Sequence, residues 1–260
     1  IVLTKNEEQR LTDCLLSLSF CDELIVIDSG STDGTVAIAQ KHKAIVYAEL
    51  SQDFAAKRNL GLQKASKDWV VYVDADERIS DALRESILFH LNSKEHLVTH
   101  SVPVVAYRLK RKNFYLGNHT WPNIEHMERL FKKTALKGWK GALHESPEVN
   151  GEIGELEGYL IHYSHQDLTD MVVKTNTWSD TEAALRIQAN HPPMAWWRFP
   201  RVMIGAFFDS YIKQRGFMAG TAGLIESMYQ SYSMFITYAK LWELQQIKAT
   251  SPIAQNTKKP

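Results

Sequence analysis

Apolar and polar positions alternate in blocks over the first 80 residues, and the blocks have the lengths of strands and helices. Short apolar runs indicate strands at residues 1–3, 23–27, 44–48 and 69–73. Segments with apolar side chains three and four positions apart predict helices at residues 6–18, 35–43 and 53–65. Strands that alternate with helices in this way predict a parallel sheet covered by helices on both faces, with right-handed crossovers.

The pattern changes twice further along the chain. Strand-like stretches at residues 107–112 and 152–163 indicate a mixed-sheet half of the same domain, and residues after 167 become helical. Prolines in HPPMAWWRFP interrupt the helical part, because proline cannot continue a helix interior. We therefore expect an α/β domain over residues 1–166, a helical region packing on it over residues 167–248, and a flexible tail over residues 249–260.

Charge is balanced overall but unevenly distributed. The 260 residues contain 30 Lys and Arg and 30 Asp and Glu, so the net charge does not favour a nucleic-acid-binding protein. Residues 1–100 carry 11 basic and 16 acidic side chains, whereas residues 194–260 carry 8 and 3. The two ends are therefore expected to meet different partners.

The two cysteines, Cys14 and Cys21, match no zinc or redox spacing and suit reduced thiols in a cytosolic protein. The chain opens on a strand-like IVLT, so no signal peptide is expected. No apolar run approaches the roughly 18 residues that a spanning helix requires, so no transmembrane anchor is expected either.

Three of the predicted strands end in polar residues, namely TKNE at 4–7, DSGSTDG at 28–34 and DADE at 74–77. Each has a local interpretation: Thr4 and Glu7 suit a helix capping box, Asp33-Gly34 a turn, and Asp76 a helix cap. In a parallel sheet, however, the carboxyl ends of the strands meet at one edge, where ligands bind. Three polar ends at one edge therefore favour a binding site.

The chemistry of this site is expected to involve a divalent cation. DSGSTDGT contains neither the dinucleotide-binding glycine pattern nor a phosphate-binding loop. Positions i and i+2 of an extended segment project to the same side, so Asp74 and Asp76 can face one ligand, whereas Glu77 faces away and is expected to be structural. Two carboxylates at such a short separation repel each other unless a cation lies between them. Mg²⁺ and Mn²⁺ bind carboxylate and phosphate oxygens.

The segment AAKRNLG adds a basic residue near that edge. Gly61 lies inside a helical pattern, where glycine costs about 1 kcal/mol relative to alanine, and it indicates close packing against a neighbouring strand. Arg58, one turn earlier, either points toward the ligand edge or forms a surface ion pair.

Together, TKNEE, LIVIDSGSTDGT and AAKRNLGLQKASKDWVVYVDADERIS resemble the family-2 glycosyltransferases with the GT-A fold. FYLGNHTWP, ERLFKK, KGWKGALHES and IHYSH resemble more narrowly the bacterial lipopolysaccharide inner-core β-glycosyltransferases. The likeness is specific over the first 80 residues, moderate in the middle and general in the C-terminal helices. It implies a Rossmann-like, mixed but mainly parallel sheet flanked by helices, with a helical C-terminal extension.

The resemblance implies that the polar strand ends bind a nucleotide sugar. Asp28 would contact the nucleotide base, and Thr4, Asn6 and Glu7 would line the same pocket. Arg58 falls where the family places a basic residue near the base or the phosphates.

Asp74-Ala75-Asp76 corresponds to the DxD motif of the family. Asp74 would reach the ribose side and the metal, and Asp76 would bind the Mg²⁺ or Mn²⁺ that bridges the donor diphosphate. His144 would complete the metal shell or orient the base, with His162 as a second possibility, although either histidine also suits a hydrogen-bonded structural role.

An inverting transfer needs a base that deprotonates the acceptor hydroxyl on the face of the sugar opposite the leaving group. The family places this carboxylate in a loop beyond the central sheet, so the resemblance makes Glu145 the candidate. Glu125 and Glu128 are the alternatives.

Aromatic side chains crowd the last third of the chain, and Arg198, Arg201, Lys213 and Arg215 are interleaved among them. Such segments suit a membrane interface, although many of the aromatics must pack the helices onto the catalytic domain. We expect both, with part of this surface peripheral to the inner membrane of a Gram-negative bacterium, on its cytoplasmic side.

These features predict a hexosyltransferase that moves glucose from UDP-glucose to a heptose of the lipopolysaccharide core. Donor and acceptor follow from the resemblance alone. The alternatives are a glycosyltransferase acting on a polyprenyl-phosphate or capsule acceptor, and a non-catalytic, membrane-peripheral module that binds nucleotide sugars. A nucleotidyltransferase would require a Gly-rich phosphate loop, which TKNEEQR does not provide.

Overall fold

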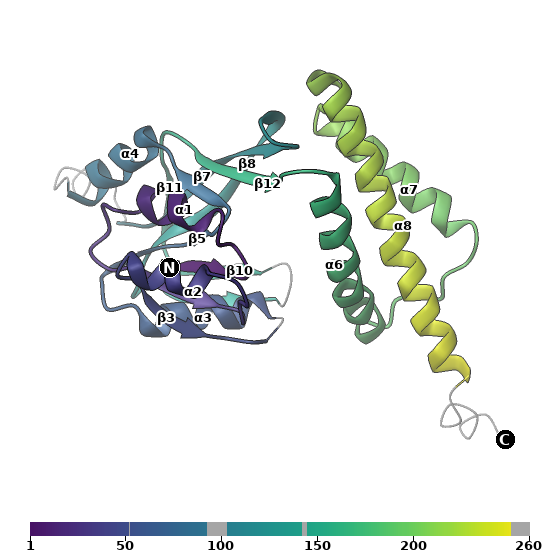
Figure 1. Cartoon of the computed structure of the whole chain (residues 1–260), viewed down its shortest axis with the longest axis horizontal. Helices are drawn as coiled ribbons and strands as arrows, with labels where there is room; N and C mark the ends of the chain where they lie inside the picture. Colours follow the sequence, from purple (N-terminus) through teal and green to yellow (C-terminus); the bar gives the residue numbers. More distant parts are fainter. Residues whose placement is uncertain (52, 93–102, 142–144, 251–260) are drawn as a thin grey trace. The chain divides into compact units, whose positions relative to one another are not determined.

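The computed structural model describes residues 1–51, 53–92, 103–141 and 145–250 (Figure 1). The chain divides into two compact units, which are described separately. The first contains Ile1–Asn113 and Ile124–Ser164, and the second contains Phe114–Asn123 and the chain from His165 onward. The predicted boundary after residue 166 stays a prediction, and residues 251–260 of the predicted tail lie outside the described residues.

The first unit begins with a parallel sheet in the order β3-β2-β1-β5. Its strands and connecting helices are β1 (Val2–Thr4), α1 (Leu11–Ser17), β2 (Ile25–Asp28), α2 (Thr35–Lys41), β3 (Ile45–Ala48), α3 (Phe54–Lys64) and β5 (Val73–Asp74). Every residue of β1 and β2 is buried, which accounts for their uninterrupted apolar runs. The predicted alternation of strands and helices in a parallel sheet is confirmed.

Helices cover both faces of this sheet. Val2 and Val26 pack in one core cluster with residues of α1 and α2, whereas Leu3 packs in a second cluster with residues of α3. A Cβ atom at Gly61 of α3 would lie 2.5 Å from Ile1 Cγ2. The close packing predicted at this glycine is therefore confirmed.

The second half of this unit is a mixed sheet in the order β4-β8-β7-β12-β6, with β11 beside β7. Its strands are β4 (Trp69–Val71), β6 (Glu77–Ile79), β7 (Val104–Tyr115), β8 (His119–Lys132), β11 (Glu152–Glu155) and β12 (Leu160–His165). α4 (Asp81–Asn92) follows β6, and β9 (Leu136–Lys140) pairs antiparallel with β10 (Ser146–Val149). Because β4 pairs with β8 and β5 pairs with β1, the segment 69–74 joins the two sheets.

The acidic end of that segment differs from the prediction. β5 includes Asp74, residues 75–76 form a turn, and β6 begins at Glu77. Asp74 and Asp76 therefore do not lie in one extended segment. The argument that strand alternation places their carboxylates on one side is wrong, because the chain turns between them.

The first predicted helix begins later than expected. α1 starts after Arg10, which makes no side-chain cap, so Thr4 and Glu7 form no capping box. Asn6 has a φ of +54°, in the left-handed region that asparagine tolerates better than most residues. Residues 5–10 instead form a loop at the carboxyl end of β1.

The second unit is helical from Leu168 onward. Its elements are α6 (Leu168–Gln188), α7 (Arg198–Phe208), a π-helical turn (Asp209–Lys213), a 3₁₀ turn (Gly216–Ala219) and α8 (Gly220–Thr250). α8 packs against both α6 and α7 (Figure 1). The described helices include none that is both long and apolar enough to cross a membrane.

Candidate active site

Asp28 ends β2 with a buried carboxylate that orders the loop behind it. Its Oδ2 accepts the backbone N–H groups of Gly30 and Ser31, each at 3.0 Å, and its Oδ1 accepts the Ser31 hydroxyl at 2.5 Å. Gly30 has a φ of +81°, a conformation that glycine adopts readily. Asp28 therefore shapes the loop itself, and its contact with a nucleotide base stays a prediction.

The loop after β1 is hydrogen-bonded to the loop after β2. Asn6 donates its N–H to Ser31 Oγ and accepts the N–H of Thr32 on Oδ1, both at 2.8 Å. Glu7 donates its N–H to Thr35 Oγ1 at 2.8 Å. Because β1 and β2 are parallel neighbours, the structure brings Asn6 and Glu7 to the same edge as the aspartate of β2.

Thr4, the last residue of β1, is buried at this edge. Its carbonyl accepts the N–H of Ser29 at 2.9 Å. Its Oγ1 is also buried, and the described residues give it no hydrogen-bond partner. Buried hydroxyl groups usually have a partner, so the Thr4 hydroxyl is an unsatisfied polar group at the carboxyl end of β1, and its contact with a nucleotide stays a prediction.

Asp74 is held by two arginines. Arg58 Nη2 donates to its two oxygens at 3.2 and 3.4 Å, and Arg129 Nη2 donates to Oδ2 at 3.2 Å. Burial opposes ionisation of this carboxyl, but the guanidinium groups of Arg58, Arg129 and Arg111 outweigh it and hold the pKa of Asp74 well below its usual range. Asp74 is therefore a carboxylate, already paired with cations, at neutral pH.

Glu77 is fully buried and has a structural role, as predicted. Its Oε2 accepts the N–H of Asp74 at 2.9 Å, and its Oε1 lies 3.2 Å from Arg111 Nη1 and 3.9 Å from Arg129 Nη2. The expectation that Glu77 faces away from Asp74 is wrong, because the turn at 75–76 brings both carboxylates to the same arginine, Arg129.

Arg58 is 1% exposed, so the alternative of a surface ion pair is wrong. Its Nε donates to Glu145 Oε1 at 2.7 Å while its Nη2 contacts Asp74. The guanidinium carbon lies 4.9 Å from the ring centre of Trp139 and 5.7 Å from that of Tyr72, at cation–π distance. Arg58 thus connects the first acid of the DxD motif to the candidate base.

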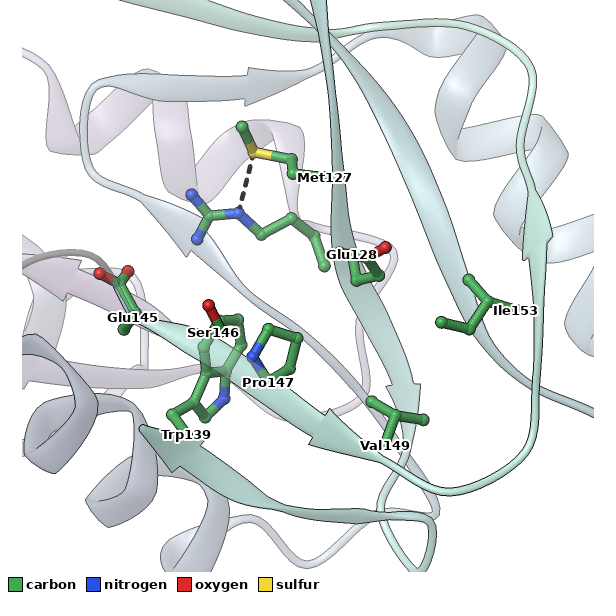
Figure 2. Close-up of a pocket in the computed structure, with 9 residues that line it drawn as sticks. Met127, Glu128, Trp139, Glu145, Ser146, Pro147, Val149 and Ile153 are labelled. Atoms are coloured by element: carbon green, nitrogen blue, oxygen red, sulfur yellow. Dashed lines mark hydrogen bonds between the residues drawn. The ribbon is translucent and has the colours of Figure 1, made fainter. Parts of the chain in front are cut away.

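Glu145 lines a cavity of about 390 Å³ just before β10 (Figure 2). The other lining residues are Met127, Glu128, Arg129, Trp139, Ser146, Pro147, Val149 and Ile153. One carboxylate oxygen of Glu145 accepts from Arg58, and the described residues give the other no hydrogen-bond partner. Among the described residues, Glu145 is therefore paired through one carboxylate oxygen only.

The two alternative bases differ in how fully they are engaged. Glu125 accepts from Arg111 Nη2 at 2.5 Å on one oxygen and from Asn113 Nδ2 at 2.7 Å on the other. Glu128 accepts from Arg108 Nε and Nη2 at 3.1 and 2.8 Å, both on Oε1. These contacts disfavour Glu125, whose two oxygens are both engaged. Glu128, like Glu145, has one oxygen without a hydrogen-bond partner among the described residues.

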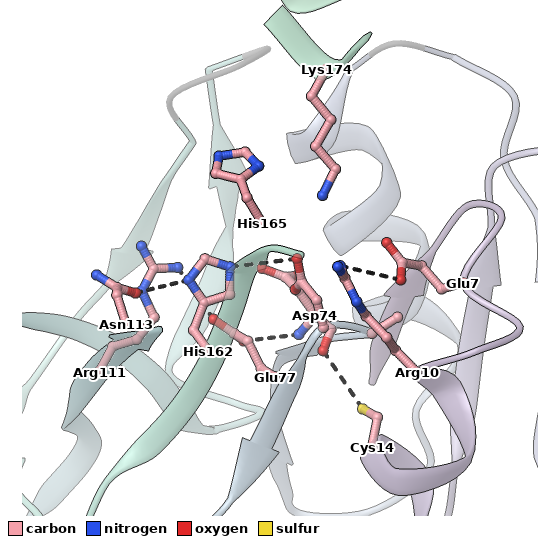
Figure 3. Close-up of polar contacts among 12 residues, drawn as sticks. Glu7, Arg10, Cys14, Asp74, Glu77, Arg111, Asn113, His162, His165 and Lys174 are labelled. Carbon is pink, nitrogen blue, oxygen red and sulfur yellow. Dashed lines mark hydrogen bonds and ion pairs between the residues drawn. The ribbon is translucent and has the colours of Figure 1, made fainter. Parts of the chain in front are cut away.

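Asp76, in the turn at residues 75–76, lies close to His162 of β12, with 3.4 Å between Asp76 Oδ2 and His162 Nε2. The other ring nitrogen of His162, Nδ1, lies 2.8 Å from Asn113 Oδ1 (Figure 3). Because Asn113 donates its amide to Glu125, its oxygen must face His162, so Nδ1 donates to Asn113 and Nε2 faces Asp76. Burial lowers the pKa of His162, but the hydrogen bond to Asp76 outweighs it and the net shift is upward.

The residues present fit a divalent cation that arrives with a diphosphate. Asp76 and His162 are close enough to share one ion, whereas Asp74 is taken up by arginines. Among the described residues, no group of three or more His, Cys, Asp or Glu side chains is arranged to hold a metal, and His144 lies outside them. Mg²⁺ and Mn²⁺ are commonly bound by one or two protein groups, with phosphate oxygens and water completing the shell.

Sequence reasoning missed the partners of these acids. Arg111, Asn113 and Arg129 lie within the long strands β7 and β8 and form a chain of contacts from Asp74 to His162. The one signal in the sequence is the presence of charged and amide residues inside these strands. The structure shows that Asn113 and Arg129 are buried, and buried polar groups of this kind require partners.

Comparison with known proteins relates this chain to sugar-transferring enzymes. The family described as Glycosyl transferase family 2 matches residues 1–144. The lipopolysaccharide core biosynthesis glycosyltransferase LpsC of Rhizobium meliloti is 27% identical over 261 residues, which cover 95% of this chain and 93% of LpsC.

Two solved structures are similar at low sequence identity. S. aureus TarS 1-349 in complex with UDP-GlcNAc is 13% identical with a TM-score of 0.44, covering 95% of this chain and 90% of TarS. Glucosyl-3-phosphoglycerate synthase of Mycobacterium tuberculosis, in complex with Mn²⁺, UDP and its product, is 20% identical with a TM-score of 0.37. The second match covers 52% of this chain and 56% of the synthase. The family match itself spans more than half of the chain, so the protein belongs to glycosyl transferase family 2 and is a glycosyltransferase, as its motifs predict.

Proposed function

We propose that this protein is an inverting hexosyltransferase that transfers glucose from UDP-glucose to a heptose of the lipopolysaccharide inner core. The observation that carries the proposal is the pair of contacts made by Arg58, which reaches both Glu145 and Asp74. The candidate base and the donor-binding motif are thereby held at a fixed separation. The likeness to LpsC over nearly the whole chain supports the lipopolysaccharide acceptor.

The donor binds at the carboxyl edge of the parallel sheet. Thr4, Asn6, Glu7 and Asp28 surround the nucleotide there, on loops that are already hydrogen-bonded to each other. Asp74 remains ionised at neutral pH because of its arginine partners, so it accepts hydrogen bonds from the ribose hydroxyls.

Asp76 and His162 are the residues that would hold Mg²⁺ or Mn²⁺. When bound, the cation supplies positive charge that stabilises the leaving nucleoside diphosphate. Asn113 Oδ1 accepts a hydrogen bond from the Nδ1–H group of His162 and so keeps Nε2 turned toward Asp76. His144 remains a further candidate ligand.

The acceptor sugar occupies the cavity beside Glu145. Glu145 takes the proton of the acceptor hydroxyl, and the resulting oxygen attacks the anomeric carbon from the face opposite the diphosphate. The bond from the anomeric carbon to the diphosphate oxygen breaks, UDP leaves with the bonding electron pair, and the anomeric configuration inverts. The acceptor is anchored in a lipid, so the reaction takes place at the cytoplasmic surface of the inner membrane.

The experiment that tests this function uses labelled nucleotide sugars and lipopolysaccharides isolated from strains with progressively truncated cores. Metal-dependent transfer from UDP-glucose to a core ending in heptose is the expected result. Transfer only to polyprenyl-phosphate acceptors would contradict the lipopolysaccharide assignment. If neither transfer nor metal-dependent hydrolysis of UDP-glucose occurs, the proposed transfer from UDP-glucose is wrong.

A further inference from the structure

α7 has one face that packs on the protein and one that does not. On the packed side, the rings of Phe199 and Phe235 lie 6.0 Å apart, and Ser231 of α8 donates to the carbonyl of Met203 at 2.8 Å. No residue of α7 is buried, although most of its side chains are apolar. Part of the apolar surface of α7 therefore faces away from α8 and is exposed, including Ile204 and Phe208.

The outward face forms a regular stripe. Trp197, Arg201, Ile204 and Phe208 follow one another at spacings of four, three and four residues, which places them on one side of the helix. Ile204 and Phe208 are 56% and 55% exposed. Ile212, in the π-helical turn, continues the stripe beyond the end of α7.

Exposed apolar side chains also flank the stripe at both ends. Trp196, before the helix, is 82% exposed, and Phe217 and Met218, after it, are more than half exposed. Exposed tryptophan and phenylalanine at the ends of an amphipathic helix are typical of segments that lie in the interfacial layer of a bilayer.

The charges around this stripe are mostly positive. Residues 194–219 contain four basic side chains, which are Arg198, Arg201, Lys213 and Arg215. The single acid in this segment, Asp209, accepts hydrogen bonds from Lys213 and Gln214 at 3.1 and 3.0 Å. The segment therefore carries a net positive charge next to an apolar surface, which complements a membrane rich in anionic lipids.

We propose that the face of residues 196–218, here called the α7 face, docks on an anionic lipid bilayer with the helix axis parallel to the membrane plane. The inference rests on the proposed function in one respect, because a lipid-anchored acceptor makes such docking useful. A second copy of the chain is the less favourable occupant, because a symmetric contact would bring the same basic side chains together.

Co-sedimentation with vesicles tests the α7 face directly. The full chain is expected to sediment with phosphatidylcholine–phosphatidylglycerol vesicles and far less with pure phosphatidylcholine vesicles, and added salt is expected to weaken binding. The double variant Ile204→Ser/Phe208→Ser should bind the mixed vesicles at least about tenfold more weakly, because two half-exposed apolar side chains are lost. Arg201→Glu should weaken binding by about tenfold as well.

Leu16→Ser is the matched control, because Leu16 on α1 has the same exposed fraction as Ile204, 56%. Equal loss in this control, or wild-type sedimentation of the double variant, overturns the proposal. The proposal is also overturned if the wild type does not bind anionic vesicles but forms a dimer in sedimentation velocity, while the double variant is a monomer. Hydrolysis of UDP-glucose in solution separates the two proposals: its absence beside normal vesicle binding contradicts the enzyme function alone.

Discussion

Arg58 Nε donates to Glu145 Oε1 at 2.7 Å, although the two residues are 87 positions apart in sequence. The same guanidinium contacts both oxygens of Asp74, and its side chain is almost completely buried. A buried ion pair is costly to form but much more costly to break on one side, because the remaining charge is left without a partner. The contact therefore ties the geometry of the candidate active site to the stability of the first unit.

Replacing Arg58 is expected to destabilise the protein strongly. Arg58→Met leaves the Asp74 and Glu145 carboxylates without this partner, which should lower the free energy of unfolding by about 3–5 kcal/mol. Arg58→Lys should cost less but still fail to restore the wild type, because an ammonium group cannot serve both carboxylates in the geometry of the fork. Urea denaturation measures both effects.

A double-mutant cycle isolates the contact with Glu145. If the pair interacts, the effects of Arg58→Met and Glu145→Gln should deviate from additivity by more than about 0.5 kcal/mol. Arg84→Met is the control, since Arg84 forms an exposed pair with Asp81 and its loss should stay within about 0.5 kcal/mol. Additive effects of the first two substitutions would contradict the structural contact.

Glu145→Gln is expected to abolish most of the transfer. A general base contributes about 10²–10⁴-fold to the rate, so kcat should fall by this range while UDP-glucose binding stays nearly unchanged. Initial rates with a heptose-terminated core, together with calorimetric titration of UDP-glucose, measure the two quantities. Glu128→Gln is the comparison, because Glu128 lines the same cavity but accepts from Arg108. Near-normal turnover in Glu145→Gln removes this residue from the mechanism.

The parallel half of the fold could be predicted because its strands β1 and β2 are buried along their whole length and read as uninterrupted apolar runs. Val26 and its neighbours in β2 are an example. The grouping of polar residues at the carboxyl edge followed from the same logic, since Asn6 follows β1, Asp28 ends β2, and the two strands are parallel neighbours. The local sequence was therefore sufficient to predict contacts between residues on adjacent parallel strands.

The rest of the site depends on contacts that no local pattern encodes. β8, for example, carries Glu125, Glu128 and Arg129 within one strand. These charged residues make the segment look exposed in the sequence, although several of its positions are buried. Arg129 meets Asp74 only because β8 lies next to β4 in a sheet whose strand order does not follow the sequence. The turn at 75–76 was missed for a related reason: it brings the side chain of Glu77 back to the N–H of Asp74, a contact that the sequence pattern does not encode.

Asp76 is expected to control metal-dependent donor binding. Asp76→Asn should remove most of the increase in UDP affinity that Mn²⁺ provides, and EDTA should bring the wild type to the same level. Asn113→Ala should weaken the effect of Mn²⁺ by about 10–100-fold, because the orientation of His162 is lost. Isothermal titration with UDP, with and without Mn²⁺, measures all three. Wild-type affinity that is unchanged by EDTA would refute the role of the metal.

The second unit contains a buried acid whose effect depends on pH. Glu226 is 2% exposed, its Oε1 accepts from Gln230 at 2.7 Å, and the described residues give its buried Oε2 no hydrogen-bond partner. Burial raises the pKa of Glu226 from 4.5 to about 7, with the hydrogen bond from Gln230 opposing the shift. The folded protein thus retains a proton that the unfolded chain releases between about pH 4.5 and 7.

The free energy of unfolding should therefore fall as pH rises through this window and become level above it. A shift of this size corresponds to at most about 3 kcal/mol. Glu226→Gln keeps the oxygen that accepts from Gln230 but cannot ionise, so it should match the wild type near pH 4 and exceed its stability by up to about 3 kcal/mol near pH 8. Urea denaturation across this range measures the difference, with Glu243→Gln, an exposed position on the same helix, as the control. If the wild type and Glu226→Gln show parallel pH profiles, Glu226 does not hold a proton in the folded state, because only a proton released on unfolding makes the two curves diverge.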